Sequence, residues 1–388
     1  MALERGAQPF ARSEYEARWT ALKATMSQRG LQTVLTTDGS SMTYLSGYIG
    51  SSGYLPQMVI LDAAWTEPKL VLRKQDVPLG IYTTQISRDN IIGYPETLVG
   101  NPERNGHDFV LDMLEDTGAH TGLLGLEEGV LSRAVYRKYE SRLGAGTLAD
   151  ISGLILSQRL VKSDAEIALM RDAARIADAG VLAAISATRP GRRECEIGGD
   201  VIHALASGLP DIDTITIKVP NISSGPRIGT AHFNWYLGTV ENGMQLNFEI
   251  VGLCHHYSAS IMRTISLGPP SEKLRRLHDG VHEGLEAGLS TVRPGVTCAD
   301  VANAYHRALN RHGFSKDSRC GYSIGMGLEP SASLQPTDMT VLEPNMTFHM
   351  MLGTWVEEDF GVTLSESFRV TETGAEVFGK SERKLFVV

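Results

Sequence analysis

The sequence predicts an α+β protein of two domains, an N-terminal α/β domain over residues 1–158 and a C-terminal α+β domain over residues 159–388. Three observations support this prediction. Strand-like and helix-like stretches alternate through the first 150 residues. A strong helix-start signal then opens a different pattern near residue 160, and a weak internal repeat follows it. A chain of 388 residues is long enough to give each domain its own core.

The first domain opens with a helix predicted over residues 13–29, because Tyr15, Trp19 and Leu22 fall on one face at helical spacing. Gly30 ends this helix. Short apolar runs follow it, and their length and composition are typical of buried strands. These predicted strands cover residues 31–36, 57–61 and 69–72.

The second domain begins at a helix-capping motif. Ser163 and Glu166 stand at the spacing of a capping box, in which the two side chains satisfy free N–H groups of the first turn. Apolar residues behind the motif share one face, so a long helix is predicted to about residue 188. The helix ends at Arg189-Pro190-Gly191.

The same domain contains a weak repeat. Arg189-Pro190-Gly191 returns 104 residues later as Arg293-Pro294-Gly295, and in both copies a long helix, this break and a second helix follow one another. Two α+β halves packed face to face would place a cleft on their pseudo-twofold axis. The alternative is a chance similarity of two helix–turn–helix units. The strand-like segments after the two copies are residues 214–219 and 245–253, then 346–351 and 363–371.

Composition excludes several classes of protein. The net charge is −9 and the pI is about 5.7, so a general nucleic-acid-binding role is not expected. The four cysteines are not spaced as a disulfide framework, and no segment has the apolar length of a membrane span or of a signal-peptide core. We therefore expect a cytoplasmic protein that acts on a small molecule, with no nucleic-acid or membrane partner.

The second domain resembles the creatinase and aminopeptidase P superfamily, whose catalytic domain is called the pita-bread fold. The resemblance implies two pseudo-symmetric α+β halves, a creatinase-type N-terminal α/β domain and a homodimer, into whose clefts Arg73 and Lys74 are expected to project. The residues that carry it are Val161 to Ile167, Met42 to Gly47, both R-P-G breaks, Arg263 to Gly268, Gly321 to Gly325 and Val341 to Met346.

Peptidases of this superfamily hold two metal ions with five side chains, and the resemblance assigns those positions here to Glu249, Ser260, Tyr322, Met351 and Ser365. Only Glu249 retains a carboxylate. Divalent metals need several deprotonated oxygen or nitrogen ligands together, so no metal cofactor is expected. This departure matches the metal-free branch of the superfamily, and within that branch the sequence is most similar to the ectoine hydrolases, through residues 319–325, 346–349 and 365–374.

Three residues are predicted to be catalytic. His232 corresponds to the superfamily's catalytic-side histidine, and imidazole is a suitable base and acid near neutral pH. Glu249 and Glu366 are expected on adjacent strands that line the cleft, where a carboxylate binds a cationic amidine, guanidine or ammonium group. The alternatives are a structural histidine and two surface glutamates at strand ends.

Four residues are predicted to bind substrate, namely Tyr322, His349, Arg263 and Trp355. Tyr322 would offer a phenolic donor, unless it is simply a packed aromatic residue. His349 would face the cleft and Trp355 would form a wall, with core packing as the alternative for Trp355. Arg263 would bind substrate or tie strands together. The acidic run Glu357-Glu358-Asp359 is predicted to be a solvated loop.

The leading functional hypothesis is a metal-independent hydrolase that cleaves a non-peptide C–N bond in a small zwitterionic nitrogen compound, such as an ectoine-like cyclic amidine or an N-acyl or guanidino amino acid. His232 would activate water. Three alternatives remain open: a metal-dependent Xaa-Pro dipeptidase or aminopeptidase with an unusual ligand set, a pita-bread lyase, and a non-catalytic binding protein. Metal analysis separates the first alternative from the leading hypothesis, and product analysis in labelled water separates the second.

Overall fold

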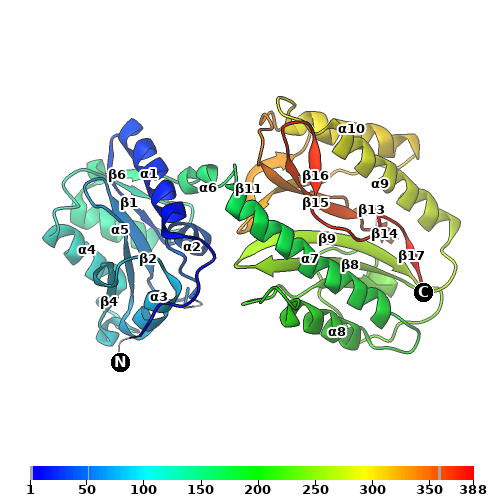
Figure 1. The fold of residues 1–388 in the computed structure, drawn as a ribbon, viewed down its shortest axis with the longest axis horizontal. Helices are drawn as coiled ribbons and strands as arrows, with labels where there is room; N and C mark the ends of the chain where they lie inside the picture. Colours follow the sequence, from blue (N-terminus) through cyan, green and yellow to red (C-terminus); the bar gives the residue numbers. More distant parts are fainter. Residues whose placement is uncertain (1–2, 51, 357–359) are drawn as a thin grey trace. The chain divides into compact units, whose positions relative to one another are not determined.

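A computed structural model describes residues 3–50, 52–356 and 360–388, without the side chains of Leu328 and Pro330, and the predicted loop Glu357-Glu358-Asp359 lies outside this range. The chain divides into two compact units, Met1–Gln158 and Arg159–Val388 (Figure 1). None of the described helices is both long and apolar enough to cross a bilayer.

The first unit is an α/β domain around a six-stranded mixed sheet with the order β4-β3-β2-β1-β5-β6. Its strands are β1 (Leu31–Thr36), β2 (Met58–Asp62), β3 (Lys69–Arg73), β4 (Ile91–Tyr94), β5 (Leu123–Leu126) and β6 (Leu148–Asp150). Its helices are α1 (Arg12–Gln28), α2 (Gly39–Ser46), α3 (Val77–Thr83), α4 (Gly106–Asp116), α5 (Arg133–Leu143) and α6 (Leu154–Gln158). As the spacing predicts, Tyr15, Trp19 and Leu22 of α1 are buried.

The second unit contains a nine-stranded sheet whose main path is β11-β10-β12-β15-β9-β8-β7, with β16 paired to β15 and β17 paired to β9. The longer strands are β7 (Asn221–Ser224), β8 (Gln245–Cys254), β9 (Tyr257–Ser266), β10 (Gly321–Gly325), β11 (Gly327–Leu334), β12 (Thr347–Met351) and β15 (Ser365–Val370). The shorter ones are β13 (Thr354–Val356), β14 (Phe360–Val362), β16 (Ala375–Val377) and β17 (Phe386–Val387). The helices are α7 (Asp164–Ala187), α8 (Glu194–Ser207), α9 (Glu272–Thr291) and α10 (Cys298–Arg311).

The capping box forms as predicted. Ser163 Oγ accepts from Glu166 N–H at 3.2 Å, and Glu166 Oε2 accepts from Ser163 N–H at 2.8 Å. The helix that it starts, α7, then packs closely on β8 (Figure 1). A Cβ placed on Gly252 of β8 would lie 1.9 Å from the carbonyl oxygen of Ala173 of α7, so only glycine permits this approach.

The internal repeat is visible in the backbone. Gly191 and Gly295 both have positive φ, 85° and 87°, and each lies three residues after the C-cap of its helix, Thr188 or Val292. Gly191 N–H donates to Val240 O at 2.9 Å, and Gly295 N–H donates to Leu342 O at 3.0 Å. The two halves therefore share a hydrogen-bond pattern as well as an order of elements, in agreement with the predicted α+β class.

One predicted strand, residues 214–219, is wrong. This segment forms no ladder, and Ile215 and Val219 are exposed. The strand of this region is β7, which begins immediately after Pro220. Proline has no N–H to donate to a ladder, so it separates the exposed segment from the strand.

The two faces of the second sheet have different neighbours. Ile250 of β8 points toward α7, since a Cβ on Gly180 would lie 2.8 Å from it, and Met350 of β12 points toward α9 at Gly288. Neighbouring residues in a strand point to opposite faces. Residues such as Glu249 and Met351 therefore occupy the face that the helices leave open.

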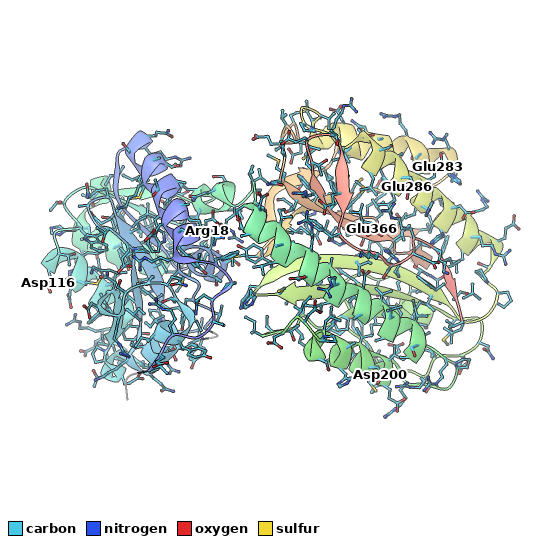
Figure 2. All side chains as sticks on the ribbon, in the orientation of Figure 1. Arg18, Asp116, Asp200, Glu283, Glu286 and Glu366 are labelled. Atoms are coloured by element: carbon cyan, nitrogen blue, oxygen red, sulfur yellow. The ribbon has the colours of Figure 1, made fainter. Side chains whose placement is uncertain are left out.

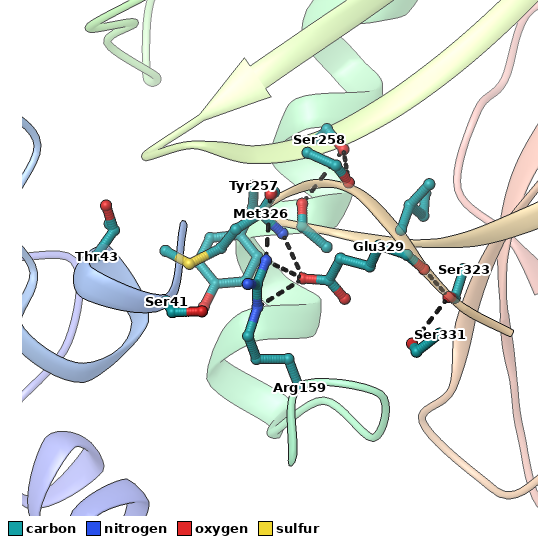
Figure 3. A network of polar contacts seen from close by, with 12 residues as sticks. Ser41, Thr43, Arg159, Tyr257, Ser258, Ser323, Met326, Glu329 and Ser331 are labelled. Atoms are coloured by element: carbon teal, nitrogen blue, oxygen red, sulfur yellow. Dashed lines mark hydrogen bonds and ion pairs between the residues drawn. The ribbon is translucent and has the colours of Figure 1, made fainter. Parts of the chain in front are cut away.

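A buried ionic network ties the start of the second unit to β11 (Figure 3). Glu329 accepts from Arg159 Nη2 at 2.7 Å and from Lys162 Nζ at 2.7 Å, and all three side chains are almost fully buried. Burial opposes ionisation of Glu329, but the two cations lower its pKa and keep it charged. Glu329 therefore has its partners within this network, away from the open face.

Candidate functional site

A cavity of about 530 Å³ lies on the open face of the second sheet. Residues of strands β7, β8, β9, β10, β12 and β13 line it, together with loop residues 218, 230–233, 318–319 and 363. Its walls are partly apolar, through Phe233, Met262, Met351 and Trp355, and a few polar groups converge on it. This combination is typical of a small-molecule site.

His232 lines this cavity from the loop that follows β7 and the short turn at Gly225–Arg227. Its φ is 57°, in the left-handed region that few residues other than glycine adopt. The loop is tied back to β7, because Ile222 N–H donates to Phe233 O at 2.7 Å. His232 is an exposed residue of the cavity lining, so its imidazole is accessible to a ligand there, as a base that exchanges protons with substrate must be.

Glu249 lines the same cavity from β8 and is half-buried. Asn221, its register partner on β7, donates from Nδ2 to Glu249 Oε2 at 2.7 Å. This hydrogen bond fixes one carboxylate oxygen and leaves the other available. Among the described residues Glu249 has no cation in a salt bridge, so its negative charge is available to a cationic ligand.

Tyr322 of β10 also lines the cavity, and His349 lies directly behind it on β12. His349 is fully buried between Tyr322 and Ser365, with Nδ1 at 3.2 Å from the Tyr322 hydroxyl and Nε2 at 2.7 Å from Ser365 Oγ. Burial lowers the pKa of His349 to about 3, so the ring is neutral. The strand pleat puts His349 on the same open face as Met351, but its ring is fully buried and does not line the cavity, so of this pair only Tyr322 is in a position to contact a ligand directly.

Two cations at the cavity escaped the sequence analysis. Arg319 stacks over the Tyr322 ring with 4.4 Å between its guanidinium carbon and the ring centroid, and Lys218 also lines the cavity. Arg319 belongs to the segment 319–325 that carries the family resemblance. Its place in that segment was the one sequence feature that could have pointed to it. Among the described residues that line it, the cavity thus combines one carboxylate with two cations, a charge pattern that suits a zwitterion.

Trp355 forms a wall of the cavity, as predicted, from the short hairpin of β13 and β14. Behind it lies Lys316, whose ammonium nitrogen is 5.6 Å from the indole centroid. Burial lowers the pKa of Lys316 to about 8. The indole is thereby supported from behind by a residue that does not line the cavity.

Glu366 and Arg263 do not line the cavity. Glu366 is on β15, which is separated from β8 by β9, so the prediction that Glu249 and Glu366 occupy adjacent strands facing one cleft is wrong. The strand pleat turns Glu366 toward α7, where it lies beside Ala174 and Ala177 (Figure 2). Arg263 Nη2 donates to Glu366 Oε1 at 2.7 Å, and both side chains are almost fully buried.

Arg263 ties strands and the C-terminal segment together rather than lining the cavity. Its guanidinium also donates to the carbonyl oxygens of Met262, Ser365, Ser381 and Glu382. Burial raises the pKa of Glu366, against the opposing effect of Arg263 and Arg383. Glu366 follows Ser365 directly in β15, and the period of two in a strand turns it to the face opposite that of Ser365.

The five positions that the resemblance assigns to metal ligands fall on five neighbouring strands, β10, β12, β15, β9 and β8. They do not fit a pair of metal ions. Burial raises the pKa of Tyr322, so its phenol stays protonated, and Met351 and Ser260 supply no anionic oxygen. Ser365 is already bound to His349. Among the described residues, no group of three or more His, Cys, Asp or Glu side chains is arranged to hold a metal ion.

Comparisons with known proteins confirm the family resemblance. Residues 168–372 match the metallopeptidase family M24, and residues 18–161 match the creatinase/prolidase N-terminal domain. The chain is 46% identical over 390 residues to the uncharacterized hydrolase/peptidase y4tL of Sinorhizobium fredii, with both chains covered in full. It is 32% identical over 394 residues to the ectoine hydrolase of Halomonas elongata, with 98% of each chain covered.

The fold is shared with solved structures of this family. An Xaa-Pro dipeptidase from Bacillus anthracis superimposes with a TM-score of 0.82 at 22% identity, covering 96% of this chain and 100% of that one. The predicted two-domain pita-bread architecture is therefore confirmed. Since both domains are matched and close relatives align along the whole chain, this protein belongs to metallopeptidase family M24 and is a hydrolase of that family.

Proposed function

We propose that the protein is a metal-independent hydrolase of a non-peptide C–N bond in a small zwitterionic nitrogen compound, with ectoine-like cyclic amidines as the leading substrate class. The observation that carries the proposal is the content of the cavity. His232, Glu249, Arg319 and Tyr322 line it together, and only one carboxylate remains at the five positions where the family's peptidases hold metal. The 32% identity to an ectoine hydrolase supports the same substrate class.

In this proposal His232 acts first as a base and then as an acid. Its imidazole takes a proton from a water molecule as the water oxygen forms a bond to the sp² carbon of the C–N group. The C–N bond then breaks, and the imidazolium returns the proton to the departing nitrogen, so that protons and electrons balance. Glu249, held by Asn221, binds the cationic nitrogen group and stabilises the charge that develops there.

The first test is hydrolysis of ectoine by the purified protein, followed by identification of the ring-opened product in ¹⁸O-labelled water. We expect the label in the product and no loss of activity after dialysis against a chelator. Cleavage of an Xaa-Pro dipeptide that is lost on chelation and restored by Mn²⁺ would instead establish the peptidase alternative. Unlabelled product would identify a lyase.

The second test is His232→Ala. General acid–base catalysis contributes about 10²- to 10⁴-fold to a rate, so kcat is expected to fall by that factor while the melting temperature stays the same. The matched control is His203→Ala, because His203 is an exposed histidine on α8 outside the cavity. Unchanged turnover in His232→Ala would remove His232 from the mechanism.

A further inference from the structure

The contacts of Tyr322, His349 and Ser365 form a chain that runs from the cavity into the sheet. Tyr322 and His349 are register partners on β10 and β12, with ring centroids 5.5 Å apart and planes at 81°. Ser365 on β15 reaches the far nitrogen of the same ring. Only Tyr322 of the three lines the cavity; His349 and Ser365 are fully buried.

The hydrogen atoms of this chain can be placed by counting donors and acceptors. A neutral imidazole has one N–H donor and one acceptor nitrogen. If Nε2 carried the proton, it would donate to Ser365 Oγ, and the Ser365 hydroxyl hydrogen would need another acceptor. The described residues offer Ser365 Oγ no partner besides His349. A buried hydroxyl without an acceptor is costly, so this arrangement is disfavoured.

If Nδ1 carries the proton, the Ser365 hydroxyl and both ring nitrogens of His349 are satisfied. Ser365 donates to Nε2, and Nδ1–H donates to the Tyr322 oxygen. The distances agree with this direction, because the contact at 2.7 Å suits an O–H donor and the contact at 3.2 Å suits an N–H donor. The hydroxyl hydrogen of Tyr322 then has no acceptor among these three residues, so it is free to be donated to a group in the cavity.

We propose that Ser365 and His349 are positioning residues that hold Tyr322 as a hydrogen-bond donor toward the cavity, where Tyr322 and Arg319 bind the carboxylate of the substrate. Arg319 lies over the Tyr322 ring and lines the same cavity, so the two donors converge on one anion. Glu249 binds the opposite charge of the zwitterion. The direction of the hydrogen bonds does not depend on the proposed function; only the identity of the anion as a substrate group rests on it.

The first experiment measures the His349 tautomer in the ligand-free protein. Selective ¹⁵N labelling of histidine and long-range ¹H–¹⁵N correlation distinguish protonated from unprotonated ring nitrogens, and the signal that disappears in His349→Gln assigns the residue. We expect Nδ1 to be protonated and Nε2 unprotonated. Should His349→Gln fail to fold, Ser365→Ala provides the assignment through the shift of Nε2. An Nε2–H tautomer overturns the proposal, whatever the substrate is.

The second experiment uses acetate, a bare carboxylate, and acetamide, its neutral isostere. Acetate is expected to shift the His349 Nδ1 resonance in the native protein, because it accepts from the Tyr322 hydroxyl, whereas acetamide is expected to shift it much less. In Tyr322→Phe the acetate affinity should fall about 10-fold, as expected for loss of a hydrogen bond to a charged group. Equal responses to the two probes, or an unchanged affinity in Tyr322→Phe, would overturn the carboxylate assignment even if ectoine is hydrolysed.

Discussion

Two glutamates of the same sheet show how its two faces differ. Glu249 on β8 faces the cavity, is half-buried and has the amide of Asn221 as its polar partner. Glu366 on β15 faces α7, is almost fully buried and is bound by Arg263 and Arg383. A charge on the cavity face is left available to a ligand, whereas a charge on the helix-covered face is neutralised within the protein.

The difference follows from burial. A carboxylate that is taken out of water must find a cation, because an unpaired buried charge is very costly. Glu366 meets this condition with two arginines, and it loses the freedom to bind substrate. Glu249 remains partly hydrated and needs no internal cation. In this fold, therefore, the partner groups of a carboxylate, rather than its residue type, distinguish a functional position from a structural one.

The largest effect on stability is expected from Glu366→Gln. The variant keeps the side-chain volume but leaves the buried Arg263 charge without its anion, and breaking a buried pair in this way costs about 3–5 kcal/mol of unfolding free energy. Denaturant unfolding measures the loss. The exposed Glu241→Gln serves as the matched control. If Glu366→Gln kept its stability but lost turnover, the assignment of Glu366 to a structural role would be wrong.

A smaller effect, and on binding rather than stability, is expected from Glu249→Gln. Removing the charge that faces the cationic group of the ligand should raise KM about 10- to 100-fold, which corresponds to about 1.4–2.7 kcal/mol. The melting temperature should stay near that of the native protein, because Asn221 can still bond an amide oxygen. Steady-state kinetics and thermal unfolding test both statements, and a large fall in melting temperature would contradict the contrast between the two faces.

Local rules account for the parts of the fold that the sequence predicted. The capping box at Ser163 and Glu166 and the apolar face of α1 depend on residues within a few positions of each other, and both form as predicted. The segment at residues 214–219 has strand-like composition, but its pairing would depend on distant strands and does not occur. Residue pattern alone does not contain that information.

The candidate site was predicted less completely than the local elements, because its composition also depends on how distant strands are ordered in the sheet. Glu249, His232, Tyr322 and Trp355 line the cavity as expected. Glu366 was misplaced because the order of strands in a sheet, and therefore which strand separates two others, is a tertiary property. Lys218 had no signal in the sequence and Arg319 only its place in the segment 319–325, and the folded sheet brings both to one cavity.

The last effect, which is the smallest per unit of the quantity varied, concerns the pH dependence of stability and the layer immediately behind the cavity. Burial lowers the pKa of His349 to about 3, whereas the unfolded chain takes up this proton near its ordinary pKa of about 6.5. Between these two pH values the unfolded state binds more protons, so the free energy of unfolding falls as the pH is lowered, by up to about 1.4 kcal/mol per pH unit from this residue. Above pH 6.5 the contribution is complete.

His349→Gln should therefore flatten the decline in stability between pH 6.5 and pH 4, as measured by urea unfolding at several pH values. His107 and His278, whose pKa burial lowers to about 4, add their slope to both proteins, so only the difference between variant and native protein counts. His203→Gln, on the surface of α8, is the control and should keep the native slope. Only a neutral His349 can donate from one ring nitrogen and accept at the other. An unaltered slope of stability against pH in His349→Gln would therefore mean that the ring is charged in the folded protein. The residues behind Tyr322 would then resemble the ion-paired face of the sheet rather than the cavity face.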